Sequence, residues 1–149
     1  LAAIEAAAEV GVRQLALVVR AASRASRAVD LAHQLGMETT VHEISGIDAA
    51  LSKTLNRIPL VFSTLPPRVA DDWVPVIGAG NGILLDVAYD PWPSALAQAW
   101  RGTVISGIHM LVHQAVEQVR FFGAGAWDES RRGDVTNAMY DSLGLARHQ

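Results

Sequence analysis

Two arginines near the start of the chain have the type and spacing of a phosphate site. Arg20 comes directly after the apolar run QLALVV at 14–19, and Arg24 follows four residues later. A guanidinium is permanently charged and binds phosphate oxygens through two parallel hydrogen bonds. In a dinucleotide-binding sheet, Arg at the end of the second strand accommodates the 2′-phosphate of NADP, whereas Asp or Glu there binds the 2′-hydroxyl of NAD. The pair therefore favours NADP, and the alternative is two solvated side chains at a strand-to-helix turn.

Three residues within or just after later apolar runs can also take part in binding or catalysis. Asp86 lies inside the run ILLDV at 83–87, and a buried carboxylate needs hydrogen-bond partners. We expect it to accept backbone N–H groups and so to organise the loop that follows. Tyr89 in that loop can donate a hydrogen bond to a ligand or can pack against the neighbouring Trp-Pro segment. Gly107 opens the longest helical pattern and permits a close approach of a ligand to the backbone.

The helical pattern at 107–122 carries two pairs at the i, i+4 spacing. His109 and His113 match a two-histidine zinc site, but Met110 stands where that motif has its catalytic Glu. No third ligand is evident, so we predict no metal site. Met110 and Gln114 form the second pair, on the neighbouring helix face. The alternative interpretation of this pair is a core methionine and a satisfied amide.

Composition narrows the class of protein. The sequence is 50% apolar and 18% charged, which is typical of one folded domain. A net charge of -3 argues against nucleic-acid and anionic-membrane partners. The absence of cysteine excludes disulfides and thiolate chemistry and fits a cytoplasmic protein. No apolar run has the length of a membrane span. The twelve basic residues include one lysine, Lys53.

Strand and helix patterns alternate along the chain. We predict strands at 14–19, 39–44, 60–63, 83–87 and 103–105. We predict helices at 1–10, from an N-cap at Ser23 to Gly36, at 47–55, around Trp73, at 94–101, at 107–122 and at 135–143. Unbroken apolar strands between helices indicate an α/β fold with a doubly wound parallel sheet, in which ligands bind at the carboxyl ends of the strands.

Two motifs in this order give the chain a family resemblance. Residues 86–91 read D-x-x-Y-x-P, and residues 107–115 read G-x-x-M-L-x-x-Q-A. Together with the Arg-x-x-x-Arg turn and the turn Ser-Thr-Leu-Pro at 63–66, they resemble the C-terminal half of shikimate dehydrogenases over essentially all 149 residues. The resemblance implies a Rossmann-like NADP-binding domain. It also implies the reversible reduction of 3-dehydroshikimate to shikimate by NADPH, a step of chorismate and aromatic amino-acid biosynthesis.

The resemblance implies roles for individual residues. The residues expected to bind NADP are Arg20, Arg24, Ser63, Thr64, Leu65, Val87, Gly107 and Met110, and those expected to reach shikimate are Tyr89 and Gln114. Arg20 and Arg24 would hold the 2′-phosphate, and Val87, Gly107 and Met110 would lie near the nicotinamide. The Asn and Thr that usually flank the first Arg are Val19 and Ala21 here.

Parts of the family's machinery are expected outside this sequence. The family's catalytic Lys/Asp pair belongs to an N-terminal catalytic domain, so we expect no catalytic residue among these 149. Residues 1–10 read as a helix without an N-cap, which predicts that the glycine-rich phosphate loop precedes Leu1. The first, central strand of the 3-2-1-4-5-6 order would then also be missing. The C-terminal helices would return toward the catalytic domain.

Two alternative functions and the oligomeric state stay open. The first is a quinate or shikimate dehydrogenase relative that uses NAD, against which the arginine pair argues. The second is a non-catalytic, shikimate-dehydrogenase-like domain that senses a metabolite. The sequence does not decide between a monomer and a homodimer.

Overall fold

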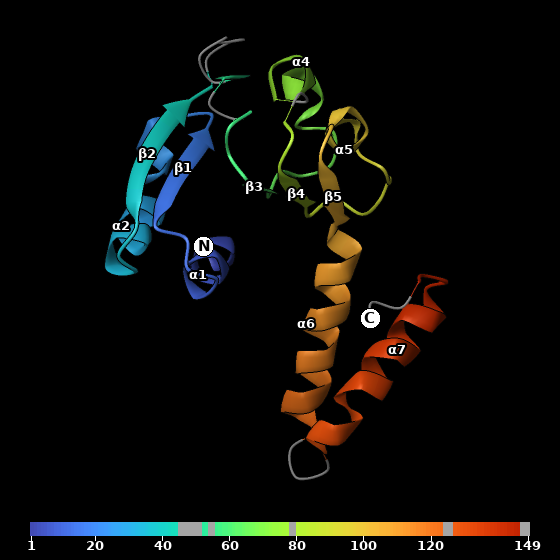
Figure 1. Ribbon diagram of the computed structural model, residues 1–149. Coiled ribbons are helices and arrows are strands. Elements are labelled where there is room, and N and C mark those ends of the chain that lie inside the picture. The colour runs from blue at the N-terminus through green and yellow to red at the C-terminus, as the bar shows by residue number, and fades with distance from the viewer. Residues whose placement is uncertain (45–51, 54–55, 78–79, 124–126, 147–149) are drawn as a thin grey trace.

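The computed structural model describes residues 1–149 except 45–51, 54–55, 78–79, 124–126 and 147–149 (Figure 1). The strands of the described residues are β1 (Gln14–Val19), β2 (Glu38–Glu43), β3 (Leu60–Ser63), β4 (Ile83–Asp86) and β5 (Thr103–Ser106). The α-helices are α1 (Ala2–Glu9), α2 (Ser26–Gln34), α4 (Val74–Ile77), α5 (Ala95–Ala99), α6 (Gly107–Phe122) and α7 (Arg132–Ser142). Short 3-10 helices are η1 (Ala22–Arg24), η2 (Asp71–Trp73) and η3 (Glu129–Arg131).

The strands form two parallel sheets. One sheet pairs β1 with β2, and the other has the order β3-β4-β5. Figure 1 shows the strands in the order β2, β1, β3, β4, β5, so that β1 and β3 are the neighbouring edges of the two sheets. Within the described part of the chain, no ladder joins these two edges. Parallel strands alternating with helices confirm the predicted α/β, Rossmann-like class.

Each sheet has its own hydrophobic core. Ile4 of α1, Ala32 of α2 and Met37 form the core beside β1 and β2. The β3-β4-β5 sheet packs on a second core of Ala70, Leu84, Leu96 and Trp100. The Trp100 indole N–H also donates to the Gly82 carbonyl at 2.8 Å, which satisfies its one polar group. The two sheets therefore have separate buried cores, and a further cluster of partly buried residues contains side chains from both sides: Val18, Ile44, Ile58 and Ile77.

Local signals in the sequence account for most element ends. Ser94 caps α5 as predicted, with its hydroxyl accepting from the Ala97 N–H at 3.0 Å. Gly36 follows α2 with φ +75°, a conformation that glycine adopts at little cost. The predicted N-cap at Ser23 is wrong: Ser23 lies inside η1, and α2 begins at Ser26 without a side-chain cap. The predicted helix at 47–55 lies mostly outside the described residues.

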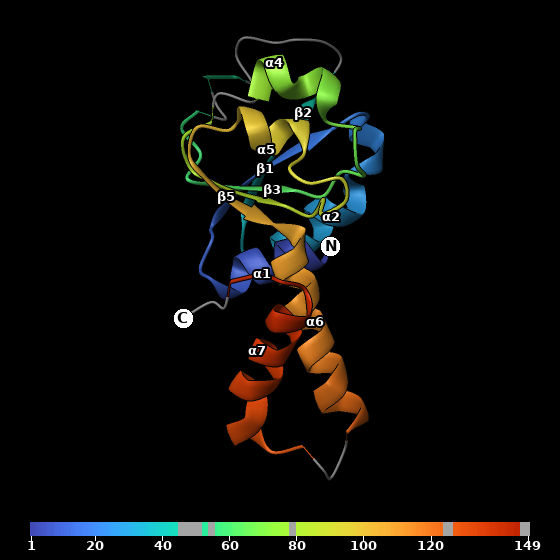
Figure 2. The same cartoon turned by 90° about the vertical axis from the view of Figure 1, so that its right-hand side faces the viewer.

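Helices α6 and α7 form a pair that extends away from the sheets in both views (Figures 1 and 2). α6 begins at the residue after β5. Ser106, the last residue of β5, caps the helix, with its hydroxyl accepting from the Ile108 N–H at 3.3 Å. Tyr140 of α7 is fully buried, and its hydroxyl lies 3.1 Å from Nδ1 of His109 on α6. No helix among the described residues is long and apolar enough to cross a membrane.

Candidate active site

Three buried polar residues lie side by side at the carboxyl edge of the β3-β4-β5 sheet. Ser63, Asp86 and Ser106 are the last residues of their strands and are direct neighbours across the sheet. Their exposed fractions are 7%, 2% and 7%. Since ligands bind outside the carboxyl ends of strands in such sheets, the row marks the edge at which the site was predicted.

Asp86 organises the loop that leaves β4. One of its carboxylate oxygens accepts from the Ala88 N–H at 3.2 Å, and the other accepts from the Ser94 hydroxyl at 2.5 Å. Ser94 in turn caps α5. The expected role of Asp86 as an acceptor of loop hydrogen bonds is therefore confirmed. Its contacts fix both ends of a loop from which Tyr89, half exposed, projects.

Gly107 brings two of the predicted nicotinamide contacts together. A Cβ atom at this position would lie 2.2 Å from the Val87 carbonyl oxygen, which is far inside contact distance. The Gly107 N–H also points to the Ala88 carbonyl at 3.4 Å. A glycine is thus required because the chain's own backbone at Val87 approaches α6 closely. The expected backbone contact of Gly107 with a ligand stays a prediction.

The turn after β3 offers one exposed side chain to a ligand. The Ser63 carbonyl accepts from the Val87 N–H at 3.0 Å, which ties the end of β3 to the start of the Asp86 loop. Thr64 is exposed, whereas Leu65 packs against the core of the β3-β4-β5 sheet. Thr64 is therefore the member of this turn whose side chain is free to reach a ligand.

Met110 and Gln114 line the same open depression on α6. Its volume is about 470 Å³, and His113, Glu117 and Gln118 complete the lining. Met110 and Gln114 are four residues apart, which places them on one helix face, as predicted. Met110 is half-buried and Gln114 is exposed.

The arginine pair lies at the end of the β1-β2 sheet rather than at the β3-β4-β5 edge. Arg20 directly follows β1, and Arg24 ends η1. Both are exposed, and neither forms an ion pair with another described residue. Two free guanidinium groups on one turn fit a dianionic phosphate, whose oxygens pair with them bidentately.

Glu43 is a residue of this region that the sequence did not reveal. It ends β2 beside Val19, and its carboxylate accepts from the Ala22 N–H at 3.1 Å. Ala22 lies between the two arginines in sequence. The contact spans 21 residues, so only the parallel register of β1 and β2 could have indicated it.

Both histidines of α6, His109 and His113, pack against the ring of Tyr140 on α7. His109 contacts the Tyr140 hydroxyl, and its ring centroid lies 5.6 Å from that of Tyr140. Burial raises the pKa of Tyr140, so the phenol stays protonated and available for this hydrogen bond. Among the described residues, no group of three or more His, Asp or Glu side chains is arranged to hold a metal.

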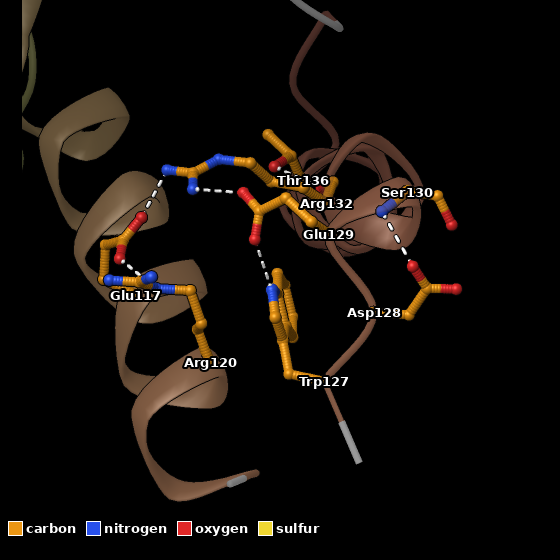
Figure 3. Close-up of polar contacts among 8 residues, drawn as sticks. All are labelled: Glu117, Arg120, Trp127, Asp128, Glu129, Ser130, Arg132 and Thr136. Atoms are coloured by element: carbon orange, nitrogen blue, oxygen red, sulfur yellow. Dashed lines mark hydrogen bonds and ion pairs between the residues drawn. The ribbon is translucent and has the colours of Figure 1, made fainter. Parts of the chain in front are cut away.

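A network of charged side chains joins the far ends of α6 and α7 (Figure 3). Arg132 binds both Glu117 of α6 and Glu129, and Glu117 also accepts from Arg120 at 2.8 Å. Burial raises the pKa of Glu117, but the hydrogen bond from Arg132 and the charges of both arginines outweigh it and lower the pKa overall. The indole of Trp127 donates to Glu129 at 2.6 Å, which together with Arg132 lowers the pKa of that carboxyl.

The parallel strands, their helices and the polar edge define a Rossmann-like α/β domain. Two solved structures resemble it closely. A shikimate dehydrogenase of Mycobacterium tuberculosis is 34% identical with a TM-score of 0.79, and the match covers 93% of this chain and 51% of that one. A shikimate 5-dehydrogenase of Mycobacterium fortuitum is 35% identical with a TM-score of 0.77, and the match covers 93% and 50%.

The chain belongs to the shikimate dehydrogenase family and corresponds to its C-terminal half. It spans about half the length of the two mycobacterial proteins. Neither a protein-family model nor a curated protein matches the sequence.

Proposed function

We propose that this chain is the NADP-binding half of a shikimate dehydrogenase, which catalyses the reversible reduction of 3-dehydroshikimate to shikimate with NADPH. The observation that carries the cofactor choice is the exposed pair Arg20 and Arg24, free of ion pairs with other described residues, on the turn after β1. Arginine at this position suits a 2′-phosphate, which NAD lacks.

The other candidate residues suit the opposite end of the cofactor and the substrate. Thr64, Val87, Gly107 and Met110 lie after β3, after β4 and at the start of α6, where the nicotinamide of NADP would be held. Bound NADPH supplies the hydride. The Tyr89 hydroxyl and the Gln114 amide are exposed hydrogen-bonding groups that suit the hydroxyl groups of shikimate.

The proposal includes an N-terminal catalytic domain that supplies the Lys/Asp pair for proton transfer. Lys53, the one lysine of this sequence, is exposed and lies between β2 and β3. The proposal also includes a central strand between β1 and β3, followed by a glycine-rich phosphate loop ahead of α1. The observed strand order supports this, because β1 and β3 are the positions that flank the first strand in the 3-2-1-4-5-6 order. We place the protein in the cytoplasm, as its lack of cysteine suggests.

Replacement of Arg20 tests the cofactor assignment. In the full-length protein, Arg20→Ala removes a charge-assisted contact of about 1.5–3 kcal/mol, so the Kd for NADPH should rise roughly 10- to 100-fold. The Kd for NADH should change little, because NADH has no 2′-phosphate. Fluorescence titration with both cofactors measures the difference.

Arg13→Ala is the matched control. Arg13 is an exposed arginine just ahead of β1, at the opposite end of the strand from Arg20. Its replacement should leave both affinities unchanged. Equal losses for NADPH and NADH in Arg20→Ala would contradict the assignment and favour an NAD-using relative.

A further inference from the structure

Glu43 is held beside the arginine turn by the backbone of the β1-β2 sheet. It pairs with Val19 across the sheet, and the next residue extends the ladder, with the Ile44 N–H donating to the Val19 carbonyl at 2.8 Å. The Glu43 carboxylate therefore has a fixed origin next to the point where the chain leaves β1. From there it accepts from the Ala22 N–H at 3.1 Å.

This hydrogen bond replaces a missing helix cap. In η1 the Arg24 N–H donates to the Ala21 carbonyl at 3.0 Å, and the Ala25 N–H donates to the Ala22 carbonyl at 2.9 Å. The Ala22 N–H belongs to the first turn, where amides have no partner within the helix. A cap residue usually supplies the acceptor, but the N-cap here is Ala21, which has none. The acceptor comes instead from the neighbouring strand.

We propose that Glu43 is a positioning residue for the 2′-phosphate site: it holds the turn from which both Arg20 and Arg24 present their guanidinium groups. The inference rests on the proposed NADP function. Glu43 acts through the backbone at Ala22, since a carboxylate close to a phosphate is electrostatically unfavourable by itself. The acceptor oxygen, rather than the negative charge, is the property that matters.

Two substitutions separate the acceptor from the charge. Glu43→Ala removes both in the full-length protein and should raise the Kd for NADPH about fivefold, the factor expected for a lost helix cap. The Kd for NADH should stay within error, which also shows that the variant is folded. Glu43→Gln keeps an acceptor oxygen and removes the charge, so its Kd for NADPH should equal the wild-type value or be lower.

Glu38→Ala is the matched control, because Glu38 is an exposed glutamate at the opposite end of β2. It should bind both cofactors as the wild type does. The inference is overturned if Glu43→Ala leaves the NADPH affinity unchanged or higher, weakens both cofactors equally, or is matched by Glu43→Gln.

Arg20→Ala in the same titration separates this inference from the proposed function. If Arg20→Ala weakens NADPH selectively while Glu43→Ala has no effect, only the role of Glu43 is wrong. If Arg20→Ala weakens both cofactors equally, the NADP assignment itself fails, and the role of Glu43 fails with it.

Discussion

At the scale of single residues, the polar side chains at the strand ends act first on the backbone around them. Asp86 accepts from Ala88 and Ser94, Ser106 caps α6, and Glu43 caps the turn after β1. Each contact gives a hydrogen-bond donor its acceptor, which is the usual requirement for polar groups near a sheet. These acceptors hold the loops from which the candidate ligand-binding groups project.

The charged network between α6 and α7 predicts a pH dependence of stability. The pKa of Glu117 is lowered in the folded protein from its ordinary value of 4.5. The contribution of ionised Glu117 to the free energy of unfolding is therefore fully present above about pH 4.5. It is lost as the pH falls through the lower pKa of the folded state. Wild-type protein should be more stable than Glu117→Gln at pH 7, and the difference should be smaller at pH 3.

Urea denaturation of the full-length protein at both pH values measures this difference. The gap at pH 7 should be small and should shrink in high salt, because Glu117 and its partners are solvent-accessible. Glu9→Gln, at the end of α1 and outside this network, is the matched control for the substitution itself. A gap that persists unchanged at pH 3 would contradict the electrostatic account.

Residue types and their positions at strand ends singled out some of the polar residues discussed above and missed others. The arginine pair and Asp86 stood out because a strand end that carries charge needs a partner or a ligand. The reason for Gly107 was missed, because the neighbour that excludes a side chain is Val87, 20 positions away in sequence. Glu43 was missed for the same reason. Such contacts depend on how strands and helices pack, and the local pattern does not contain them.

At the scale of elements, the packing of α6 against the loop after β4 positions the residues proposed to contact the nicotinamide. Gly107→Ala would place a methyl group 2.2 Å from the Val87 carbonyl, and backbone cannot move aside as a flexible side chain can. We expect the free energy of unfolding to fall by about 1–3 kcal/mol, the usual cost of overpacking. Catalytic turnover of the full-length protein should fall as well, because α6 carries Met110 and Gln114.

Gly133→Ala is the matched control for this substitution. Gly133 lies in α7, and a Cβ atom there would meet nothing within 4 Å. Alanine restricts the unfolded chain and favours a helix, so stability should stay the same or rise by about 0.5–1 kcal/mol. If both glycines behave alike in urea denaturation, the close approach at Val87 is not what requires Gly107.

Local sequence patterns predicted most of the helices and strands. The predictions failed where an element depends on contacts with distant parts of the chain. β1, β3 and α6 have the predicted bounds, since apolar runs and a Gly or Ser at their ends mark them directly. β2 begins one residue earlier than predicted and α7 three residues earlier. The Ser23 cap failed because the chain makes a 3-10 turn first, and that turn is capped by Glu43 from another strand.

At the scale of the whole molecule, the division into two sheets is the feature with the largest consequences. β1 and β3 each present an edge without a ladder partner among the described residues. None of the side chains of β1 is fully buried, although its sequence QLALVV is typical of a buried central strand. A strand between the two edges would satisfy both the backbone groups and this apolar surface.

Expression of these 149 residues alone tests that interpretation. We expect aggregated or poorly folded protein without measurable dehydrogenase activity, because open strand edges pair readily with other chains. Thermal unfolding followed by circular dichroism should show no cooperative transition. A cooperative melt together with the NADPH affinity of the full-length protein would show that the two sheets need no strand between them.

Steady-state kinetics of the full-length protein provide the decisive test of whether this chain is the NADP-binding half of a shikimate dehydrogenase. Initial rates are measured by NADPH absorbance with 3-dehydroshikimate, and in reverse with shikimate or quinate and either NADP or NAD. We predict turnover with 3-dehydroshikimate and a kcat/KM that is much higher for NADPH than for NADH. Preference for NADH and quinate, or specific binding of shikimate without any turnover, would contradict that assignment.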